Sequence, residues 1–502
     1  MKSFLFTAVF AVLYFYVPAQ TDNKIVIGKV DSVYSNILGE QRKVWVYVPS
    51  GFLGTNDSTT RFPVVYLLDG DSHFQSVVGV IQQLSEANGN SNFPQMIVVA
   101  IPNTDRTRDL TPTHIQSDLP NMDSNFSKNT GGGENFVAFM EKELMPHIDS
   151  VYPTQPYRLL IGHSFGGLTV MNVLTNHTKL FNAYVAIDPS MWYDKEKFLK
   201  ATEQKLAQKK YDGIKLYLGI ANTMPDGMTI EKMLKDTTAT TRHIRSIFTL
   251  DKFIKANKQS SLQFAGKYYA DDDHGSVPLI TEYDALRFIF NYYKYKFTTQ
   301  DFTDSSTAFV TKYKAHYQTV SKELGYKVSP PEVLTNGLAY QSLNSKFFTK
   351  AAAFYKLNLE NYPASSNAYI AYGDLLASIK DTANAILYYQ KAFALSKNDE
   401  TLQKLNSLQG EEVFKLAAEQ LQKYAGVYVF ESLSITSTVT LKDAVLWLSA
   451  GQGVYELVPL SPDTFGIKNV NGFKLHFEMN GDKPTGLTST QPNGIFIGKL
   501  KE

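Results

Sequence analysis

The sequence predicts a mostly parallel α/β sheet flanked by helices, followed by an all-α repeat segment and a small all-β C-terminal domain. Apolar segments alternate with helical ones up to about residue 297, a helical pattern then recurs at a fixed interval, and short β-like segments end the chain. At 502 residues the chain has room for about three domains. We expect a signal peptide at 1–19, the α/β domain at 20–300, the helices at 301–410 and the β domain at 411–502.

The α/β region contains seven short apolar segments that we interpret as strands. Early segments alternate apolar and polar residues, as half-covered strands do, whereas the middle ones are almost continuously apolar, as in strands buried on both faces. Helical patterns such as 135–148 and 281–295 separate or follow them, and this alternation is typical of a parallel sheet. The expected strands are residues 43–48, 63–68, 95–101, 158–161, 183–187, 215–220 and 262–269.

The helical segment repeats itself at an interval of 34 residues, at which Ala351 and Tyr355 recur as Ala385 and Tyr389. Small residues let two helices cross closely, and aromatic residues fill the space between them. The segment resembles a pair of tetratricopeptide repeats, with an ordinary helical hairpin pair as the alternative. Two repeats bury little surface alone, so we expect them to pack on a neighbour, and they are the candidate site for a protein partner.

Residues 426–498 contain short β-like segments separated by Gly, Asn, Asp and Pro. This close spacing predicts an antiparallel sheet or a small barrel. The segment resembles the small β domain of unknown function that often follows exported bacterial serine hydrolases. That resemblance indicates where such domains occur, and it does not indicate what this one does.

The N-terminus is typical of an export signal. Lys2 precedes an apolar run at residues 4–17, and Val17-Pro18-Ala19 places small residues where a signal peptidase cuts. A membrane anchor is the alternative, but the run is shorter than the ~20 residues that a spanning helix needs. No later segment is long and apolar enough to cross a bilayer. We therefore expect an exported bacterial protein, periplasmic or secreted, without a transmembrane segment in the mature chain.

Composition excludes several classes of protein. The chain has 49 Lys plus Arg against 48 Asp plus Glu, so nothing indicates a basic surface for nucleic acid. It has no Cys, which excludes disulfides, thiolate nucleophiles, and cysteine zinc or iron–sulfur sites. Any nucleophile must therefore be a hydroxyl or a carboxylate.

The strongest local pattern is GxSxG, formed by Gly162, Ser164 and Gly166. An apolar strand pattern precedes it and a helical pattern follows it. A strand that turns abruptly into a helix strains its central residue, and flanking glycines avoid collisions there. The pattern predicts the nucleophile elbow of an α/β hydrolase fold, with Ser164 at the carboxyl edge of the sheet. The alternative is a Gly-rich turn in which Ser164 merely caps a helix.

Serine needs a base, and α/β hydrolases supply a histidine after the last strand. His274 is the histidine in that place, in a polar turn after the expected strand at 262–269. We therefore expect His274 to be the general base. The alternatives are an exposed histidine in an acidic turn, or a metal site with the neighbouring aspartates, which no second ligand cluster supports.

The acid that orients the imidazole is open. It normally follows one of the strands before the last, and Asp226, after the strand at 215–220, fits that order best. Glu231 lies five residues further on, and Asp188 lies one strand earlier. A Ser/His dyad without a close carboxylate is the remaining alternative. We expect Asp226.

The oxyanion of an acyl-transfer intermediate needs backbone donors. The helix after Ser164 points its free N–H groups at this place, so Phe165 is the first expected donor. The second donor is expected from Gly70 or Asp71, in the loop after the strand at 63–68. His73, in the same loop, is a candidate pocket wall.

Five segments, taken together and in order, are similar to motifs of the "putative esterase" family of α/β hydrolases, which includes esterase D, enterochelin esterases and feruloyl esterases. The resemblance implies Ser164 as nucleophile, His274 as base and Trp192 as a wall of the acyl or alcohol pocket. Relatives often carry a Glu soon after the strand at 215–220, where this chain has Asn222, so the acid stays open. The segments are residues 66–74 (YLLDGDSHF), 101–112 (IPNTDRTRDLTP), 162–167 (GHSFGG), 188–192 (DPSMW) and 273–276 (DHGS).

The loop at 103–111 carries two further candidates. Arg106 or Arg108 follows a strand end, where a guanidinium can receive a substrate carboxylate or a sugar hydroxyl. An Arg and Asp pair that pins the loop is an equally good interpretation.

The sequence thus predicts an exported serine carboxylic ester hydrolase that works through an acyl-enzyme. The expected substrate is a small or carbohydrate-linked ester of the acetyl or feruloyl type, or a siderophore ester, and the fold does not choose among them. No metal or organic cofactor is implied. The alternatives are an acyltransferase or a peptidase on the same fold, and a non-catalytic binding or scaffold protein that uses the helical repeats.

Overall fold

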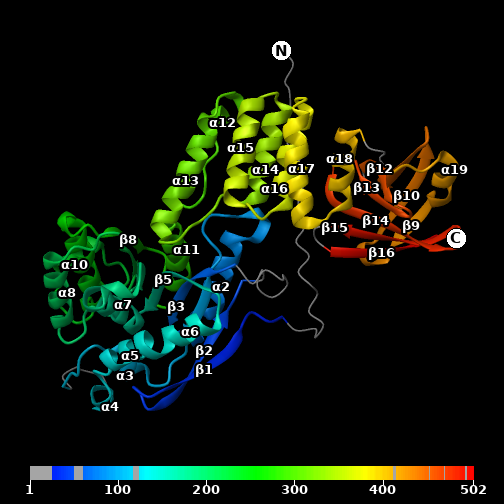
Figure 1. Cartoon of the computed structure of the whole chain (residues 1–502). Coiled ribbons are helices and arrows are strands. Elements are labelled where there is room, and N and C mark those ends of the chain that lie inside the picture. Colours follow the sequence, from blue (N-terminus) through cyan, green and yellow to red (C-terminus); the bar gives the residue numbers. More distant parts are fainter. Residues whose placement is uncertain are drawn as a thin grey trace. The chain divides into compact units, whose positions relative to one another are not determined.

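The computed structural model describes residues 25–49, 60–116, 124–410, 414–451, 453–468, 470–491 and 494–501. The predicted signal peptide, residues 1–19, lies outside these ranges. The chain divides into two compact units, one of residues 18–296 with 318–328 and the other of 297–317 with 329–502. The α/β sheet belongs to the first unit, and the helical repeats and the β domain belong to the second (Figure 1).

The first unit is built on one eight-stranded sheet in the order β1-β2-β4-β3-β5-β6-β7-β8. The pairs from β4 through β8 are parallel, whereas β1 pairs with β2, and β2 with β4, antiparallel. This confirms the mainly parallel α/β sheet. The strands are β1 (Lys29–Ser35), β2 (Glu40–Tyr47), β3 (Phe62–Leu68), β4 (Ile97–Ile101), β5 (Thr154–His163), β6 (Ala183–Ile187), β7 (Lys215–Ala221) and β8 (Gln263–Tyr269).

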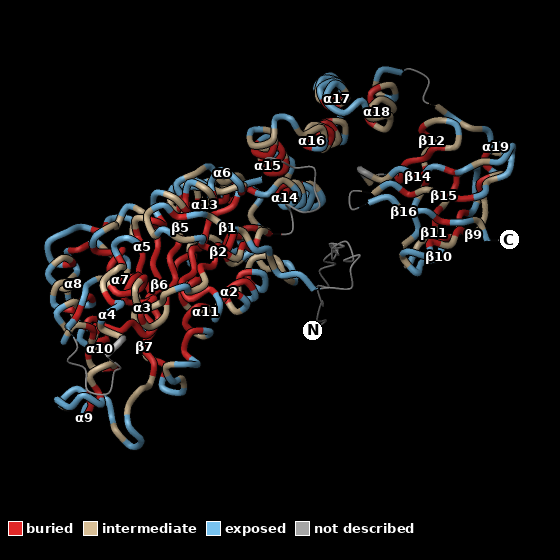
Figure 2. The backbone as a smooth tube through the Cα atoms, turned by 90° about the horizontal axis from the view of Figure 1, so that it is seen from below, coloured by how far each residue is buried: buried red, intermediate tan, exposed pale blue. Residues whose placement is uncertain are grey.

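Helices cover both faces of this sheet, and its central strands are buried (Figure 2). In β3 every residue is buried, and alternate side chains join different cores: Tyr66 packs with α7 on one face, and Leu67 packs with α2 and α11 on the other. The helices are α2 (Gly70–Ser85), α3 (Arg106–Leu110), α4 (Ser124–Lys128), α5 (Gly133–Phe139), α6 (Met145–Val151), α7 (Phe165–Asn176), α8 (Lys197–Gln208), α9 (Ile230–Lys235), α10 (Arg242–Ala256) and α11 (Val277–Ile289).

The helical segment forms successive helix pairs. Ala351 and Ala385 are fully buried, as their repeated positions predict, and Gly373 leaves room for the ring of Tyr389, which a Cβ would meet at 2.7 Å. The helical segment is thereby confirmed, while binding of a protein partner to it stays a prediction. The helices are α12 (Thr299–Thr303), α13 (Ala308–Leu324), α14 (Glu332–Asn344), α15 (Phe348–Asn361), α16 (Ser366–Ser378), α17 (Thr382–Ser396) and α18 (Asp399–Gln409).

The C-terminal β domain is a closed antiparallel barrel in which β9 pairs with both β10 and β16. Of the two predicted forms, sheet or barrel, the barrel is therefore the one observed. The short helix α19 (Ala418–Leu421) precedes it. The strands are β9 (Gly426–Phe430), β10 (Ile435–Lys442), β11 (Val445–Ala450), β12 (Gly453–Ser461), β13 (Thr464–Ile467), β14 (Val470–Asn480), β15 (Lys483–Gln491) and β16 (Gly494–Leu500).

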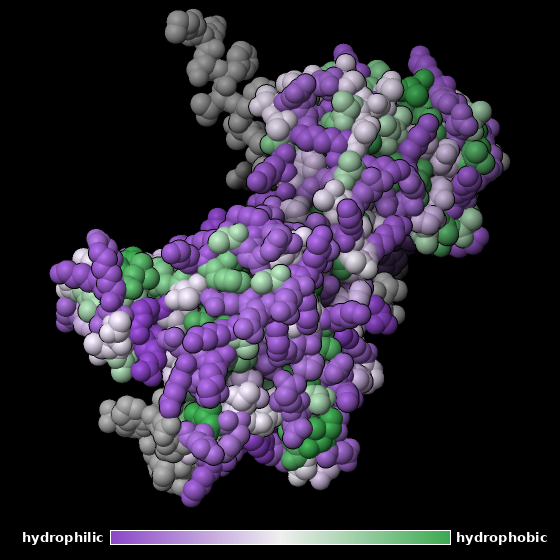
Figure 3. All heavy atoms as spheres, turned by 90° about the vertical axis from the view of Figure 1, so that its left-hand side faces the viewer, coloured by the Kyte–Doolittle hydropathy of each residue, from purple (hydrophilic) through white to green (hydrophobic). Residues whose placement is uncertain are grey.

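Within the described residues, no helix combines the length and apolar character that a bilayer-spanning segment requires. The face of the protein in Figure 3 is mainly hydrophilic, with apolar side chains in small separate groups.

Candidate active site

Ser164 lies on a sharp turn between β5, which ends at His163, and α7, which begins at Phe165. Its backbone has φ 59° and ψ −113°, a strained conformation for a residue with a side chain. The turn tolerates no bulk at its first glycine, because a Cβ on Gly162 would lie 2.4 Å from the carbonyl oxygen of Gly166. The local geometry is that of the predicted elbow.

The turn after β6 braces the elbow from the neighbouring strand. The backbone N–H of Ser164 donates to the carbonyl of Ile187 (3.0 Å), and the N–H of Ser190 donates to the carbonyl of Ser164 (3.1 Å). The two hydroxyl oxygens of Ser164 and Ser190 lie 3.3 Å apart. Asp188 therefore leaves the sheet directly beside the nucleophile candidate.

His274 is bonded to Asp188. Its Nδ1 lies 2.6 Å from Asp188 Oδ2, and since a carboxylate only accepts, Nδ1 carries the proton. Nε2 is then the basic nitrogen of the ring. The other oxygen of Asp188 accepts the backbone N–H of Ala221 (3.0 Å), so this buried carboxylate is fixed from two sides.

The loop that carries His274, between β8 and α11, is tied to the end of β7. The backbone N–H of Asn222 donates to the carbonyl of Asp272 (2.8 Å), and the Asn222 side-chain amide donates to the carbonyl of Ala270 (2.9 Å). Asn222 thus positions the loop of His274.

The expectation that Asp226 is the acid is corrected by this geometry. Asp226 is exposed in the loop after β7, and the imidazole of His274 is bonded to Asp188. Glu231 is also exposed and pairs with Lys235. Asp188 reaches His274 because β6 lies beside β7, which lies beside β8, so all three strands end at one edge of the sheet. We take Asp188 as the proposed acid from here on.

No hydrogen bond joins Ser164 to His274 among the described residues, but both lie at this edge. The ring of His163, the residue directly before Ser164, has its centroid 4.5 Å from that of His274. Catalytic hydrogen bonds are often long before a substrate binds.

A second histidine, His243 of α10, shares the carboxylate. Its Nε2 lies 2.7 Å from Asp188 Oδ2. Burial would raise the pKa of Asp188, but hydrogen bonds from His243 and His274 outweigh this and hold that pKa well below its ordinary value. The three residues place one ligand atom each within 4.8 Å of one another, so among the described residues they form a group that suits a transition metal such as Zn²⁺.

Two further histidines extend the row behind Ser164. The rings of His163 and His73 have centroids 5.5 Å apart, and His73 Nδ1 lies 3.7 Å from the fully buried Glu282. Burial and the neighbouring imidazoles lower the pKa of His163 to about 4, and burial raises the pKa of Glu282 to about 8. Both groups are therefore uncharged at neutral pH. His73, with 13% of its side chain exposed, belongs to this internal row and not to an open pocket wall.

The expected oxyanion donors lie at two helix ends that meet at the elbow. Phe165 is the first residue of α7 and Gly70 is the first of α2, so their N–H groups, and that of Asp71, have no partner within the helix. A Cβ on Gly166 would lie 2.9 Å from Oδ2 of Asp69, the residue before Gly70, which shows how closely the two turns approach.

The two arginines of the 103–111 loop have different surroundings. Arg106 forms two bonds to Asp69, from Nε to Oδ1 (2.6 Å) and from Nη2 to Oδ2 (3.0 Å), and its guanidinium lies 5.4 Å from the ring centre of Phe165. It therefore lies beside the elbow, with about a third of its side chain exposed.

Arg108, by contrast, is tied to the scaffold. Its three guanidinium nitrogens donate to Asp109 and Glu40. The hydrogen bond from Arg108 is the largest cause that lowers the pKa of Glu40 to about 2. Arg42, which is buried, donates to the same two carboxylates. Arg108 therefore pins the loop, and we correct its expected role as a substrate-binding residue.

Aromatic rings line the approach to the elbow. Phe165 stacks on Phe126 of α4, with 5.8 Å between ring centroids, and its centroid lies 6.0 Å from the half-buried Trp192. Trp192 is thus placed beside the expected oxyanion donor, and its contact with a substrate stays a prediction.

Comparison with known proteins agrees with this geometry. Residues 35–259 match the model of a family described as "Putative esterase". The α/β part of the chain is therefore similar to this esterase family. The ferri-bacillibactin esterase BesA of Bacillus subtilis is 32% identical over 151 residues, which are 28% of this chain and 52% of that protein. The siderophore enterobactin esterase of Emericella nidulans is 24% identical over 234 residues, 42% of this chain and 77% of that protein.

A solved structure extends the similarity. The crystal structure of an IroE-like serine hydrolase from Shewanella oneidensis is 29% identical to this chain, with a TM-score of 0.56, and the match covers 66% of this chain and 99% of that one. An uncharacterised protein from Capnocytophaga ochracea, 18% identical with a TM-score of 0.52, shares the fold over 76% of this chain. The chain spans about half the length of the first curated relative.

Proposed function

We propose that this chain is a serine carboxylic ester hydrolase with Ser164 as nucleophile, His274 as general base and Asp188 as the acid that orients the base. One observation carries the proposal: a serine on a strained strand-to-helix turn lies at the same sheet edge as an imidazole that is bonded to a buried carboxylate. The family of residues 35–259 supports ester hydrolysis as the reaction.

In the proposed reaction, His274 Nε2 takes the proton of Ser164 Oγ as this oxygen attacks the ester carbonyl carbon. Because Asp188 accepts from Nδ1, Nε2 is free to accept that proton, and the carboxylate then stabilises the imidazolium. The N–H groups of Phe165 and of Gly70 or Asp71 bind the oxyanion. The imidazolium protonates the leaving alcohol. A water molecule then attacks the acyl carbon as His274 takes its proton, and the imidazolium returns a proton to Ser164 Oγ as the carboxylic acid leaves.

A siderophore ester is the substrate class that we favour. The E. nidulans relative is named a siderophore enterobactin esterase, and BesA is named a ferri-bacillibactin esterase. The half-buried rings of Phe126 and Trp192 pack on the buried Phe165, and the partly exposed Arg106 guanidinium lies near the Phe165 ring, a combination of aromatic and cationic groups that suits an aromatic acyl group with oxygen substituents. Acetyl and feruloyl esters, and transfer of the acyl group to another alcohol, use the same acyl-enzyme and are the alternatives.

The catalytic assignment is tested with p-nitrophenyl acetate, using the purified protein and the variants Ser164→Ala and His274→Ala. Each variant is expected to lose at least about 10³ in kcat. Hydrolysis by Ser164→Ala at the rate of the unchanged protein ends the assignment of the nucleophile.

The substrate class is tested by kcat/KM for enterobactin, methyl ferulate and p-nitrophenyl acetate. We expect enterobactin to exceed the other two by at least about tenfold, because only a specific site converts binding energy into rate. A preference of that size for methyl ferulate would replace the siderophore proposal with the feruloyl alternative and leave the nucleophile unaffected.

Export is proposed from the pattern at residues 1–19 alone. Expression in a bacterium should yield, in the periplasm or medium, a protein whose N-terminal residue is Gln20. Recovery of the chain in the cytoplasm with Met1 to Ala19 retained would contradict it.

A further inference from the structure

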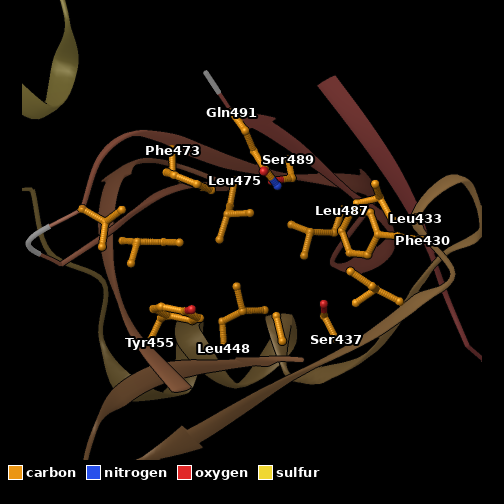
Figure 4. A pocket seen from close by; sticks show the side chains of 14 residues that line it. Phe430, Leu433, Ser437, Leu448, Tyr455, Phe473, Leu475, Leu487, Ser489 and Gln491 are labelled. Carbon is orange, nitrogen blue, oxygen red and sulfur yellow. The ribbon is translucent and has the colours of Figure 1, made fainter. Parts of the chain in front are cut away.

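The C-terminal barrel contains a cavity of about 230 Å³. Its lining is mainly apolar and includes Leu448, Phe473 and Leu487, whose side chains converge from different strands in Figure 4. Eight-stranded barrels have an interior that side chains can just fill or that can hold one small ligand. The cavity therefore raises the question of which case applies here.

Side chains fill another part of the same interior tightly. Tyr424, just before β9, packs its ring against Phe477 and Phe465, with centroids 4.8 and 5.0 Å away, and Tyr428 packs 5.5 Å from Phe477. All four rings are buried, and none of them lines the cavity. Because these aromatic residues close their part of the core, the cavity is a distinct space and not a sign of loose packing throughout the barrel.

The cavity reaches the protein surface. Among the residues that line it, Ile435 at the start of β10 and Tyr455 of β12 keep 38% and 37% of their surface exposed. Part of the cavity lining is therefore accessible from outside at these two residues.

The polar groups of the lining are few and uncharged. Ser437 lies on the opposite side of the cavity from Ser489 and Gln491 (Figure 4). Gln491 Nε2 donates to Ser489 Oγ at 3.0 Å, and both serines are buried. No Asp, Glu, Lys, Arg or His belongs to the described lining. Such a site satisfies a hydroxyl or an ester group but offers no partner for a formal charge.

We propose that the barrel binds one uncharged, mainly apolar molecule of about nine carbons that carries a hydroxyl or ester group. The size follows from the volume: an apolar protein cavity of about 150 Å³ holds one benzene, or roughly 25 Å³ per carbon, so this cavity holds about nine. The proposal rests on the barrel alone and does not depend on the function proposed for Ser164.

Binding is tested by isothermal titration of the full chain with hexanol, nonanol, dodecanol and nonanoate. We expect one nonanol per chain, at least tenfold weaker binding of hexanol, no further gain with dodecanol, and at least tenfold weaker binding of nonanoate, which would bring an unpaired charge into the cavity. Absence of nonanol binding, or affinity that keeps rising to dodecanol, overturns the proposal.

The location is tested by Ser437→Phe, which adds a ring the size of benzene, enough to fill an apolar cavity of roughly 150 Å³. The matched control is Thr440→Phe, an exposed position on the same strand β10. The first variant should lose at least tenfold in nonanol affinity and the control should lose none; equal affinities overturn the proposal.

A measurement on the unchanged protein covers the case in which Ser437→Phe does not fold. Methyl NMR should show transfer of magnetisation between nonanol and the methyl groups of Leu448 and Leu487, and its absence at saturating nonanol overturns the proposal equally.

Discussion

Replacing Asp188 by Asn tests the architecture of the site more sharply than removing a reacting group does. Asp188 is fully buried, and its Oδ2 lies 2.6 Å from His274 Nδ1 and 2.7 Å from His243 Nε2. The amide nitrogen of Asn brings two N–H donors to that position, where both imidazoles now donate. His274 must then take the other tautomer, with its proton on Nε2, or turn away from residue 188.

The expected cost follows from this change of tautomer. A ring that is protonated at Nε2 cannot accept the proton of Ser164, and the same change in the triad of serine proteases lowers kcat by about 10⁴. We therefore expect Asp188→Asn to lose about 10³ to 10⁴ in kcat/KM with p-nitrophenyl acetate, or roughly 4 to 5.5 kcal/mol of transition-state stabilisation.

The matched control is Asp226→Asn, which removes the same charge from the loop after β7. Asp226 is exposed, so we expect its kcat/KM to stay within about twofold of the unchanged protein. Circular dichroism establishes that both variants are folded. The reasoning is refuted if Asp188→Asn keeps more than a tenth of the activity, or if Asp226→Asn loses as much as Asp188→Asn does.

Three further predictions follow from the geometry. Gly162→Ala should lower the free energy of unfolding by at least about 3 kcal/mol in urea titrations, because its Cβ would lie 2.4 Å from a backbone oxygen of α7. The control Gly79→Ala, at an exposed helix position, should raise the free energy of unfolding by about 0.5 to 1 kcal/mol. Equal effects of the two substitutions would contradict the elbow. Glu282 has a folded pKa of about 8 against an ordinary 4.5, so its protonated form stabilises the fold and this contribution is lost as pH rises from 4.5 through 8. Relative to Glu282→Gln, the unchanged protein should therefore lose a few kcal/mol over that range, and parallel pH profiles would contradict the burial of a carboxyl group. Micromolar Zn²⁺ should inhibit ester hydrolysis by binding Asp188, His243 and His274, and EDTA should restore the rate. His243→Asn should weaken this inhibition at least tenfold. An unchanged inhibition constant in this variant would show that the metal binds elsewhere.

Local patterns were enough to predict the parts of the fold that depend on neighbouring residues. The elbow at Ser164 is such a part, because its steric requirement lies within Gly162 to Gly166. Strand β1 carries no such pattern: its seven residues KVDSVYS are mostly exposed at the edge of the sheet, so they form no apolar run. Closure of the barrel likewise depends on the pairing of β9 with β16. These two strands lie far apart in the sequence of the domain, so no local pattern predicts that they pair.

A site residue could be predicted only where its position along the chain, relative to the strands, indicates its role. His274 follows from its place after the last strand, whereas Asp188 contacts it across 86 residues through the order of three strands, which the sequence does not display. His243 lies within an amphipathic helix, where a histidine carries no signal of its role. Arg106 and Arg108 have similar positions in the sequence. Their roles differ because β2 brings Glu40 to Arg108, and the sequence does not show this contact.

The central claim is that Ser164 is the reacting nucleophile, and a fluorophosphonate probe tests it most directly. Mass spectrometry of the protease-digested, probe-treated protein should find the phosphonyl group on the peptide that contains Ser164, with no label on that peptide in His274→Ala over the same time. Label on another serine at full occupancy, or a folded protein that takes up no probe while it hydrolyses p-nitrophenyl acetate, would contradict the account.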